Sequence, residues 1–282
     1  MPLVFVPTPL GNLRDITLRA LDLLRDAEVI VAEDTRVARK LLAALRLPGR
    51  KLLSYREENA DDVTPKILER ARSANVVVTC DAGMPGISDP GSALVAAARA
   101  VGVPVEVLPG PSVPPAVALL SGFPLDRFSF EGFPPRTIGA RKKRFEDALR
   151  REATTIWYES PQRLRAMLKD LAVVAPDAGV FVVREYTKMH EEQLWGTPDE
   201  ILARLPERLR GEIALVVAPY SAPEKSQPGS TDDAIDSLLR GGGRVGDVAK
   251  ALAQQGFGDR RRLYARVAAR KALRDASLNE GP

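Results

Sequence analysis

Short apolar runs alternate with segments of helical periodicity through the first 110 residues of the chain. The runs are rich in valine, leucine and isoleucine and are too short for helices, so they are typical of buried strands. Between them, apolar residues recur at helical spacing, as Leu18, Leu21 and Leu24 do in the first such segment. This alternation predicts an α/β fold with a mostly parallel sheet that helices cover on both faces. The predicted strands are residues 3–6, 28–32, 51–55, 76–78 and 103–108.

A second α/β domain is predicted to follow the first. We place the first domain at residues 1–112 and the second at residues 113–221. The apolar runs of the second domain again have strand length, and we expect some of its strands to be antiparallel. A strand is predicted to begin at Phe128, and others at residues 154–158, 179–183, 193–197 and 212–217.

The end of the chain has a different composition. Residues 222–230 are rich in proline, serine and glycine, which predicts a linker before a helical tail domain at residues 231–282. Three helices are predicted in the tail, and the middle one followed by a glycine turn resembles a helix-turn-helix. A small packing or dimerisation subdomain is the alternative, but the basic last helix favours a nucleic-acid contact. The predicted helices are residues 232–239, 245–254 and 260–273.

The fourth predicted strand runs into an unusual loop, TCDAGMPGISDPG at residues 79–91. Its glycines and prolines exclude regular structure, and a helical segment follows at once. Loops between a strand and a helix usually have about two to six residues, so this longer one favours a ligand loop over an ordinary connection. In a parallel sheet such a loop lies at the carboxyl edge, where α/β proteins bind ligands. Residues 7–12, 33–36 and 109–113 are expected at the same edge.

The amino-acid composition excludes few kinds of binding site or partner. The chain has 282 residues and a formal net charge of +4, which permits a polyanionic partner without requiring one. Its single cysteine and single histidine exclude a disulfide framework and a metal site built from those residues. It has no long uncharged apolar run and no signal-peptide pattern, so we expect a cytoplasmic protein with no membrane contact and no metal.

Several features remain open at this level. The basic segment 136–151 fits a solvated helix face as well as a polyanion-binding surface. Glu33 and Asp34 are also what the first turn of a helix favours. Trp195 is interpreted as a core aromatic, whereas Phe133 fits either a core position or a platform for a stacked base.

Seven segments considered together carry a more specific signal. As a set they resemble the tetrapyrrole methylase superfamily of S-adenosylmethionine-dependent methyltransferases. Within it, they are most similar to the bacterial enzymes that methylate a cytidine ribose of 16S rRNA. Tyr186 and Met84 depart from the usual residues, leucine and threonine. The resemblance extends to about Val217, and the tail also resembles the C-terminal domain of those enzymes. The segments are PTPLGNLRDIT (7–17), AEDTR (32–36), DAGMPGISDPG (81–91), PGPS (109–112), EGF (131–133), YESP (158–161) and REYTK (184–188).

The resemblance implies two α/β domains with S-adenosylmethionine in the cleft between them, and a homodimer. It implies 2′-O-ribose methylation of a cytidine in the decoding region of 16S rRNA, with the rRNA presented within the small ribosomal subunit. Carbon methylation of a porphyrin or corrin ring, and a non-catalytic role as an RNA-binding ribosome assembly factor, are the alternatives. The cofactor-contact candidates are Leu10, Asp81, Gly83, Met84, Ile87, Ser112, Val113, Tyr158 and Ala214.

A ribose hydroxyl is a poor nucleophile while neutral, so a nearby carboxylate or lysine is needed to take up its proton. The candidates for this catalytic role are Glu33, Asp34, Asp89, Glu185 and Lys188. Arginine and lysine side chains are suited to holding the phosphates of an RNA backbone. The RNA-binding candidates are Arg36, Lys40 and Arg184, together with Arg260, Arg261 and Arg262 of the tail.

Overall fold

A computed structural model describes residues 2–221, 231–255 and 257–279 of the chain, without the side chains of residues 272–279. Its contacts divide the chain into two compact units, Met1–Tyr220 and Ser221–Pro282. The predicted linker, residues 222–230, lies outside the described residues. The boundary between two α/β domains at residues 112 and 113 stays a prediction, because the contacts group both sheets in the first unit.

The first sheet has five strands in the order β3-β2-β4-β1-β5, and every neighbouring pair is parallel. The prediction of a parallel sheet is confirmed. Each loop that leaves a strand therefore emerges at the same edge of the sheet. The strands are β1 (Leu3–Phe5), β2 (Val29–Ala32), β3 (Lys51–Ser54), β4 (Val76–Thr79) and β5 (Val105–Val107).

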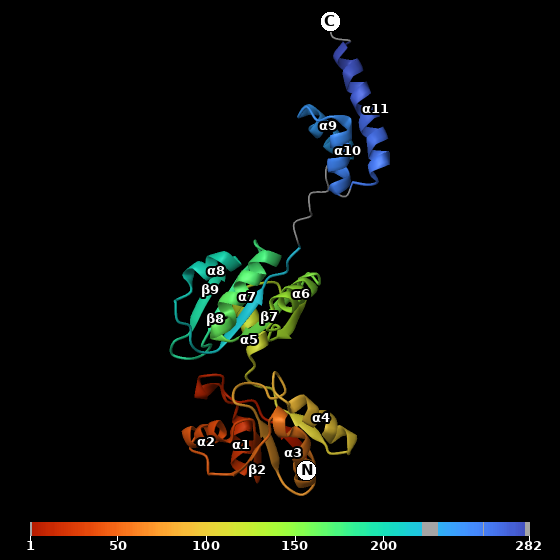
Figure 1. Ribbon diagram of the computed structural model, residues 1–282. Coiled ribbons are helices and arrows are strands. Elements are labelled where there is room, and N and C mark those ends of the chain that lie inside the picture. Colours follow the sequence, from red (N-terminus) through yellow and green to blue (C-terminus); the bar gives the residue numbers. More distant parts are fainter. Residues whose placement is uncertain (1, 222–230, 256, 280–282) are drawn as a thin grey trace. The chain divides into compact units, whose positions relative to one another are not determined.

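Helices cover both faces of this sheet, as the sequence predicts. Alternate strand residues point to opposite faces, so Val29 and Val31 pack on one side and Ile30 on the other. Helices α3 and α4 cover the first face and α1 and α2 cover the second (Figure 1). The helices are α1 (Leu18–Asp26), α2 (Thr35–Ala44), α3 (Ala60–Ala71) and α4 (Gly91–Ala100), with 3₁₀ turns at Leu13–Asp15 and Glu57–Asn59.

The second sheet is mixed, in the order β6-β7-β10-β8-β9. Only β6 and β7 are parallel, and β10 lies between β7 and β8 with antiparallel pairing to both. The expected antiparallel strands are thus confirmed. The strands are β6 (Phe128–Gly132), β7 (Thr154–Glu159), β8 (Val180–Arg184), β9 (Glu192–Gly196) and β10 (Ile213–Val217).

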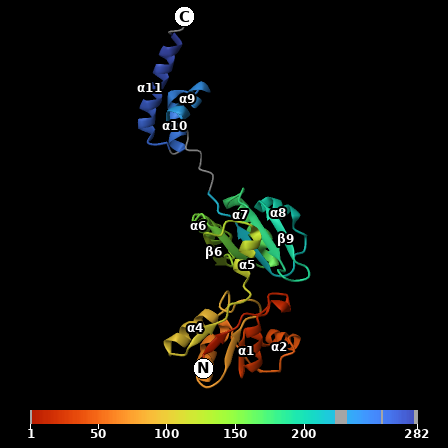
Figure 2. The ribbon, with the colours of Figure 1, turned by 180° about the vertical axis from the view of Figure 1, so that it is seen from behind.

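Helices cover the second sheet unequally. One face packs against α6 (Ile138–Leu149), α7 (Pro161–Val174) and α8 (Pro198–Arg204), which lie along the same side in Figure 1. The other face packs against α5 (Val113–Ser121), seen from behind in Figure 2. Trp195 lies on the edge strand β9 with its ring tilted against Phe181, and it is 45% exposed. Its interpretation as a core residue is wrong, because β9 is the edge strand of its sheet and nearly half of the Trp195 surface is exposed.

The tail contains the three predicted helices, α9 (Thr231–Arg240), α10 (Val245–Gln254) and α11 (Arg260–Asn279). Ile235, Leu252 and Val267 belong to its small core, one from each helix. Two arginines of α11 pair with aspartates of α9, with Arg266 2.9 Å from Asp232 and Arg270 2.7 Å from Asp236. In the part of the chain that the structure describes, no helix is long and apolar enough to cross a membrane.

Candidate active site

A cavity of about 410 Å³ lies at the carboxyl edge of the first sheet, against strand ends of the second. Pockets of about 300–1,000 Å³ are typical for small-molecule ligands. The first sheet contributes loops, and the second contributes the ends of β7, β8 and β10 together with the segments next to them. The lining residues are Leu10, Ala82 and Ser88 from the loops, Val113 at the start of α5, and Phe133, Tyr158, Glu159, Ser160, Pro161, Val183, Tyr186, Gly211, Glu212, Ile213 and Ala214 from the second sheet.

Backbone hydrogen bonds give the loop after β4 its shape. Asp89 is an acceptor within its own loop, because its carboxylate receives the Gly86 and Gly91 N–H groups at 2.8 Å each. A Cβ on Gly91 would lie 2.8 Å from the Gly86 nitrogen, so no other residue fits there without displacing the backbone. The turn holds Ser88 in the left-handed region at φ +67°, next to the cavity. Asp89 therefore shapes the wall of the cavity.

Two loops from neighbouring strands β1 and β4 join at the same edge. Thr8 and Gly83 exchange backbone hydrogen bonds of 2.9 and 3.0 Å. Gly83 has φ +81°, and a Cβ there would lie 2.9 Å from the Leu10 side chain. Glycine at position 83 therefore leaves space that Leu10 fills, and Leu10 in turn lines the cavity.

Three carboxylates gather beside these loops. Asp34 caps helix α2 and pairs with Arg36, whose hydrogen bonds hold the pKa of that carboxyl well below its usual range. Asp81 accepts a hydrogen bond from the Asp34 N–H at 3.1 Å, and burial raises its pKa. Burial also raises the pKa of Glu33, with added repulsion from Asp81 and Asp89. Of the three carboxyls, Glu33 and Asp81 therefore bind a proton more tightly than Asp34 does.

A tight polar cluster lies at the corresponding end of the second sheet. The Glu185 carboxylate accepts the Lys188 amine at 3.0 Å and the Glu212 N–H at 2.9 Å. These hydrogen bonds lower the pKa of Glu185. Burial alone would lower the pKa of Lys188, but its bonds to Glu185 and Glu212 raise it on balance. A paired lysine of this kind keeps its proton and is suited to holding structure rather than to removing a proton.

Backbone strain accompanies this cluster. Glu185 and Thr187 have φ of +54° and +63°, and between them Tyr186 lines the cavity. The left-handed region is costly for a β-branched residue, and such strain gathers at functional sites. A Cβ on Gly11 would lie 2.4 Å from the Lys188 side chain, so the loop after β1 packs directly on this strained segment.

The predicted RNA-binding residues fall into different settings. Arg36 and Lys40 line a shallow hollow on α2. Arg184, at the end of β8, instead forms an ion pair of 3.0 Å with Glu192 of the neighbouring strand β9. In the tail, Arg260, Arg261 and Arg262 are exposed at the start of α11.

The structure places only some predicted cofactor residues at the cavity. Leu10, Val113, Tyr158 and Ala214 line it, whereas the described lining does not include Asp81, Gly83, Met84, Ile87 or Ser112. None of the predicted catalytic residues, Glu33, Asp34, Asp89, Glu185 and Lys188, is among the residues that line this cavity. Among the lining residues outside the seven segments, sequence reasoning missed Val183, Gly211, Glu212 and Ile213. Their only signal was their position at the ends of β8 and β10, and the strand order was needed to bring those ends together.

Another cavity, of about 430 Å³, lies between α3 and the β2–β3 edge. Val29, Lys51 and Val76 line this cavity, and each is the first residue of its strand. The cavity therefore lies at the amino edge of the first sheet, opposite the edge that carries the loops of the candidate site. No group of three or more histidine, cysteine, aspartate or glutamate side chains suited to a metal ion occurs among residues 2–221, 231–255 and 257–279.

Two α/β layers with a cavity at the carboxyl edge of a parallel sheet define a class of ligand-binding enzyme folds. Residues 2–202 match the family of tetrapyrrole (corrin/porphyrin) methylases, and the chain belongs to this family. Ribosomal RNA small subunit methyltransferase I of Thermotoga maritima is 40% identical over 219 residues, which cover 77% of this chain and 97% of that protein. The protein of the same name from Synechocystis is 36% identical over 268 residues, which cover 93% and 95%.

Solved structures share the fold at lower identity. Diphthine synthase superposes with a TM-score of 0.62 at 18% identity, over 77% of this chain and 90% of that one. Uroporphyrin-III C-methyl transferase from Thermus thermophilus, complexed with S-adenyl homocysteine, superposes with a TM-score of 0.55 at 22% identity. That match covers 77% of this chain and 97% of the other.

Proposed function

We propose that this protein uses S-adenosylmethionine to methylate the ribose 2′-hydroxyl of a cytidine in the decoding region of 16S rRNA. The observation that carries the proposal is the length of the likeness to ribosomal RNA small subunit methyltransferase I. The Synechocystis relative matches 268 residues, whereas the family match ends at residue 202. The longer match necessarily includes most of the three-helix tail. A role specific to these relatives, and not only the methylase fold, is therefore favoured.

The residues of the cavity fit S-adenosylmethionine. Its volume is in the range for a nucleoside-sized ligand, and Gly83 provides the close approach through which Leu10 forms a wall. Apolar Leu10, Val113 and Ala214 would hold the flat and aliphatic parts of the ligand. Nearby Ser88 and Ser160 offer hydroxyls for its polar groups. When bound, S-adenosylmethionine supplies an activated methyl group.

The residues of the chain must orient the acceptor hydroxyl and accept its proton. Among the predicted catalytic residues, Glu33 is the best candidate for the base, because burial raises the pKa of its carboxyl and a carboxylate with a raised pKa is a stronger base. Asp34 pairs with Arg36, Asp89 shapes its loop, and Glu185 pairs with Lys188, so each of these already has a structural role. We therefore assign proton acceptance to Glu33.

The proposal also includes the partners. Arg36 and Lys40 would hold rRNA phosphates near the cavity, and Arg260, Arg261 and Arg262 would hold phosphates through the tail. Arg184 is a weaker candidate, because Glu192 already neutralises it. We further propose that the protein is a homodimer, and that it works in the cytoplasm on small ribosomal subunits.

The test is transfer of a tritiated methyl group from S-adenosylmethionine to small subunits that lack the modification. Free 16S rRNA and a porphyrin serve as parallel acceptors. We expect the label in an alkali-resistant 2′-O-methylcytidine. Label only on the porphyrin would replace the proposed substrate by that of a ring methylase. Binding of subunits with no transfer to any acceptor would favour a non-catalytic assembly factor.

A further inference from the structure

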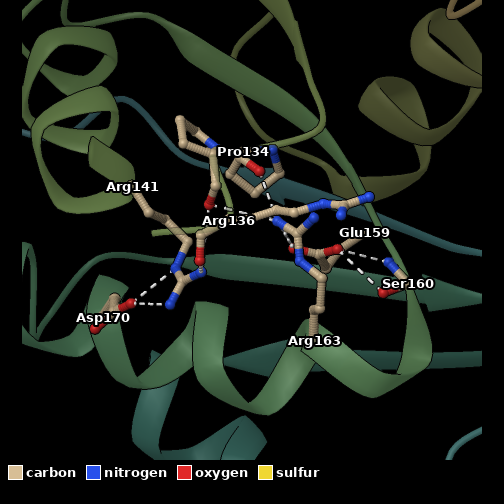
Figure 3. Close-up of polar contacts among 8 residues, drawn as sticks. Pro134, Arg136, Arg141, Glu159, Ser160, Arg163 and Asp170 are labelled. Carbon is tan, nitrogen blue, oxygen red and sulfur yellow. Dashed lines mark hydrogen bonds and ion pairs between the residues drawn. The ribbon is translucent and has the colours of Figure 1, made fainter. Parts of the chain in front are cut away.

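One wall of the cavity is a loop that long-range contacts hold in place. Strand β6 ends at Gly132, which has φ +68°, and Phe133, Pro134 and Pro135 follow it. Arg163 of α7 donates a hydrogen bond to the Pro134 carbonyl at 2.6 Å. The same guanidinium pairs at 3.1 Å with Glu159, whose side chain is 0% exposed. The loop is thereby tied to the end of β7, which forms the adjoining wall (Figure 3).

A second arginine holds the next part of the same loop. Arg141 donates to the carbonyls of Pro135 at 3.3 Å and of Arg136 at 3.0 Å. Its Nε donates to Asp170 at 2.7 Å, and its side chain is only 5% exposed (Figure 3). Burying an arginine is costly unless its donors are satisfied. Here they are used to fix loop carbonyls, so the position of this loop is strongly determined.

The loop before these carbonyls presents an aromatic ring to the solvent. Phe133 is 55% exposed, although it is a large apolar side chain that lines the cavity. Its ring meets the Tyr158 ring edge-on, with centroids 5.6 Å apart and planes at 63°. Tyr158 in turn contacts Phe130 at 4.8 Å, so the orientation of Phe133 is supported from behind. One face of a fixed phenyl ring thus remains available at the mouth of the cavity.

Basic side chains follow Phe133 in the sequence. Residues 136–151 contain seven basic and two acidic side chains. Several of them are paired, including Arg144 with Glu131 at 2.8 Å. Arg136 and Lys143 are exposed in the same segment. An exposed flat ring followed closely in the chain by exposed cations suits single-stranded RNA, because the ring can stack on a base while the cations hold phosphates.

We propose that Phe133 is the platform on which the acceptor pyrimidine base stacks, held in position by Arg163 and Arg141. The inference rests on the proposed function, since it assigns the base of the same acceptor nucleotide. The interior of the cavity is left for the methyl donor, and the exposed ring at its mouth meets the incoming nucleotide. Stacking positions the ribose without reading the sequence, because every base has a flat face.

The test compares Phe133→Leu with Phe133→Trp and the wild type. Leucine keeps apolar volume but has no flat ring, and Phe133 is exposed, so folding is expected to persist. Phe128→Leu is the matched control, because Phe128 is a 49% exposed phenylalanine at the start of β6, just before this loop, and it does not line the cavity. For each protein, calorimetry gives the S-adenosylmethionine affinity without RNA. Methyl transfer to unmodified small subunits gives kcat and KM.

We expect Phe133→Leu to raise KM for the subunit by about fivefold to a hundredfold, the range for losing one stacked base. The S-adenosylmethionine affinity should stay within about twofold of wild type, and Phe133→Trp should retain activity. An unchanged KM in Phe133→Leu would overturn the inference alone, since the wild type would still methylate its substrate. An equal loss of S-adenosylmethionine affinity would also overturn it, by assigning Phe133 to the cofactor. A wild type with no transfer to subunits would overturn the proposed function and the stacking assignment with it.

Discussion

The two sheets build the cavity in different ways. In the first sheet, loops at one edge are shaped by contacts within and between themselves, as in the Thr8–Gly83 bridge and the Asp89 turn. In the second sheet, side chains hold backbone carbonyls and strand ends across the fold, as Arg163 and Arg141 do. In the loops of the first sheet, substitutions of the glycines and of Asp89 are therefore expected to be poorly tolerated. The second depends on buried charges that must stay paired.

This difference suggests a division of labour. Glu33 has a raised pKa and is at the edge of the first sheet, whereas Glu185 has a lowered pKa and is bonded to Lys188 at the edge of the second. A carboxylate with a raised pKa suits proton transfer, and one with a lowered pKa suits a permanent ion pair. We therefore expect chemistry from the first sheet and positioning from the second.

The largest expected effect tests that division directly. Glu33→Gln should lower the single-turnover rate of methyl transfer by about 10²-fold or more, the usual contribution of a general base. S-adenosylmethionine affinity, measured by calorimetry, should change little. Glu57→Gln, at an exposed position, is the control. If Glu185→Gln abolished transfer while Glu33→Gln kept the full rate, the chemistry would belong to the second sheet.

The next effect concerns the buried pair of the second sheet. Arg163→Met leaves the Glu159 carboxylate buried without its cation, so unfolding should become easier by about 3 kcal/mol in chemical denaturation. The double change Arg163→Met with Glu159→Gln should recover much of the loss, because no unpaired charge remains. Arg150→Met, at an exposed arginine, is the control and should cost little. Equal stability of Arg163→Met and the wild type would show that the ion pair does not hold this wall.

A smaller effect is expected from the loop of the first sheet. Asp89→Ala removes the acceptor of two backbone N–H groups, which typically costs about 1 kcal/mol for each hydrogen bond. We expect S-adenosylmethionine to bind about tenfold more weakly, or about 1.4 kcal/mol, because Ser88 lies in this turn, lines the cavity and loses its fixed position. Asp89→Asn retains one acceptor oxygen and should lie between the two proteins. Full affinity in Asp89→Ala would mean that the Asp89 turn does not shape the ligand site.

The smallest effect is a pH dependence of stability. Because the pKa of Glu33 is raised on folding, the folded state holds this proton more tightly than the unfolded state does. Stability from Glu33 is therefore lost as the pH rises from about 4.5 through the raised pKa. At pH 7–8, Glu33→Gln should melt about 1 °C higher than wild type, a small gain because the side chain is partly solvated. The difference should disappear below pH 4.5, and a variant that melts lower at pH 8 would contradict the raised pKa.

The local pattern of the chain was enough to predict most of the fold. The predicted strands and helices match the observed ones, because burial on both faces of a parallel sheet leaves short continuous apolar runs that the sequence displays. The irregular loop at residues 79–91, from which Ala82 and Ser88 line the cavity, was also apparent from its glycines and prolines. Tyr158 and Leu10 were assigned to the cofactor through the resemblance of their segments, and both line the cavity.

The settings of individual polar residues were not predictable in this way. Nothing in the sequence distinguishes Glu33 from Asp34, yet the fold leaves one partly buried near other carboxylates and pairs the other with Arg36. Edge position likewise decided that Trp195 is half-exposed.

Sequence by itself therefore determined the elements, the parallel first sheet and the irregular loop at residues 79–91, since these depend on residues close together in the chain. Tertiary structure alone decided which strand ends meet, because β10 lies between β7 and β8 and brings Gly211 and Ala214 beside Tyr158. It also decided how the loop that carries Phe133 is held, because Arg163 donates a hydrogen bond to the Pro134 carbonyl, 29 residues away in the chain. Such contacts follow from strand order and helix packing, which no local periodicity encodes.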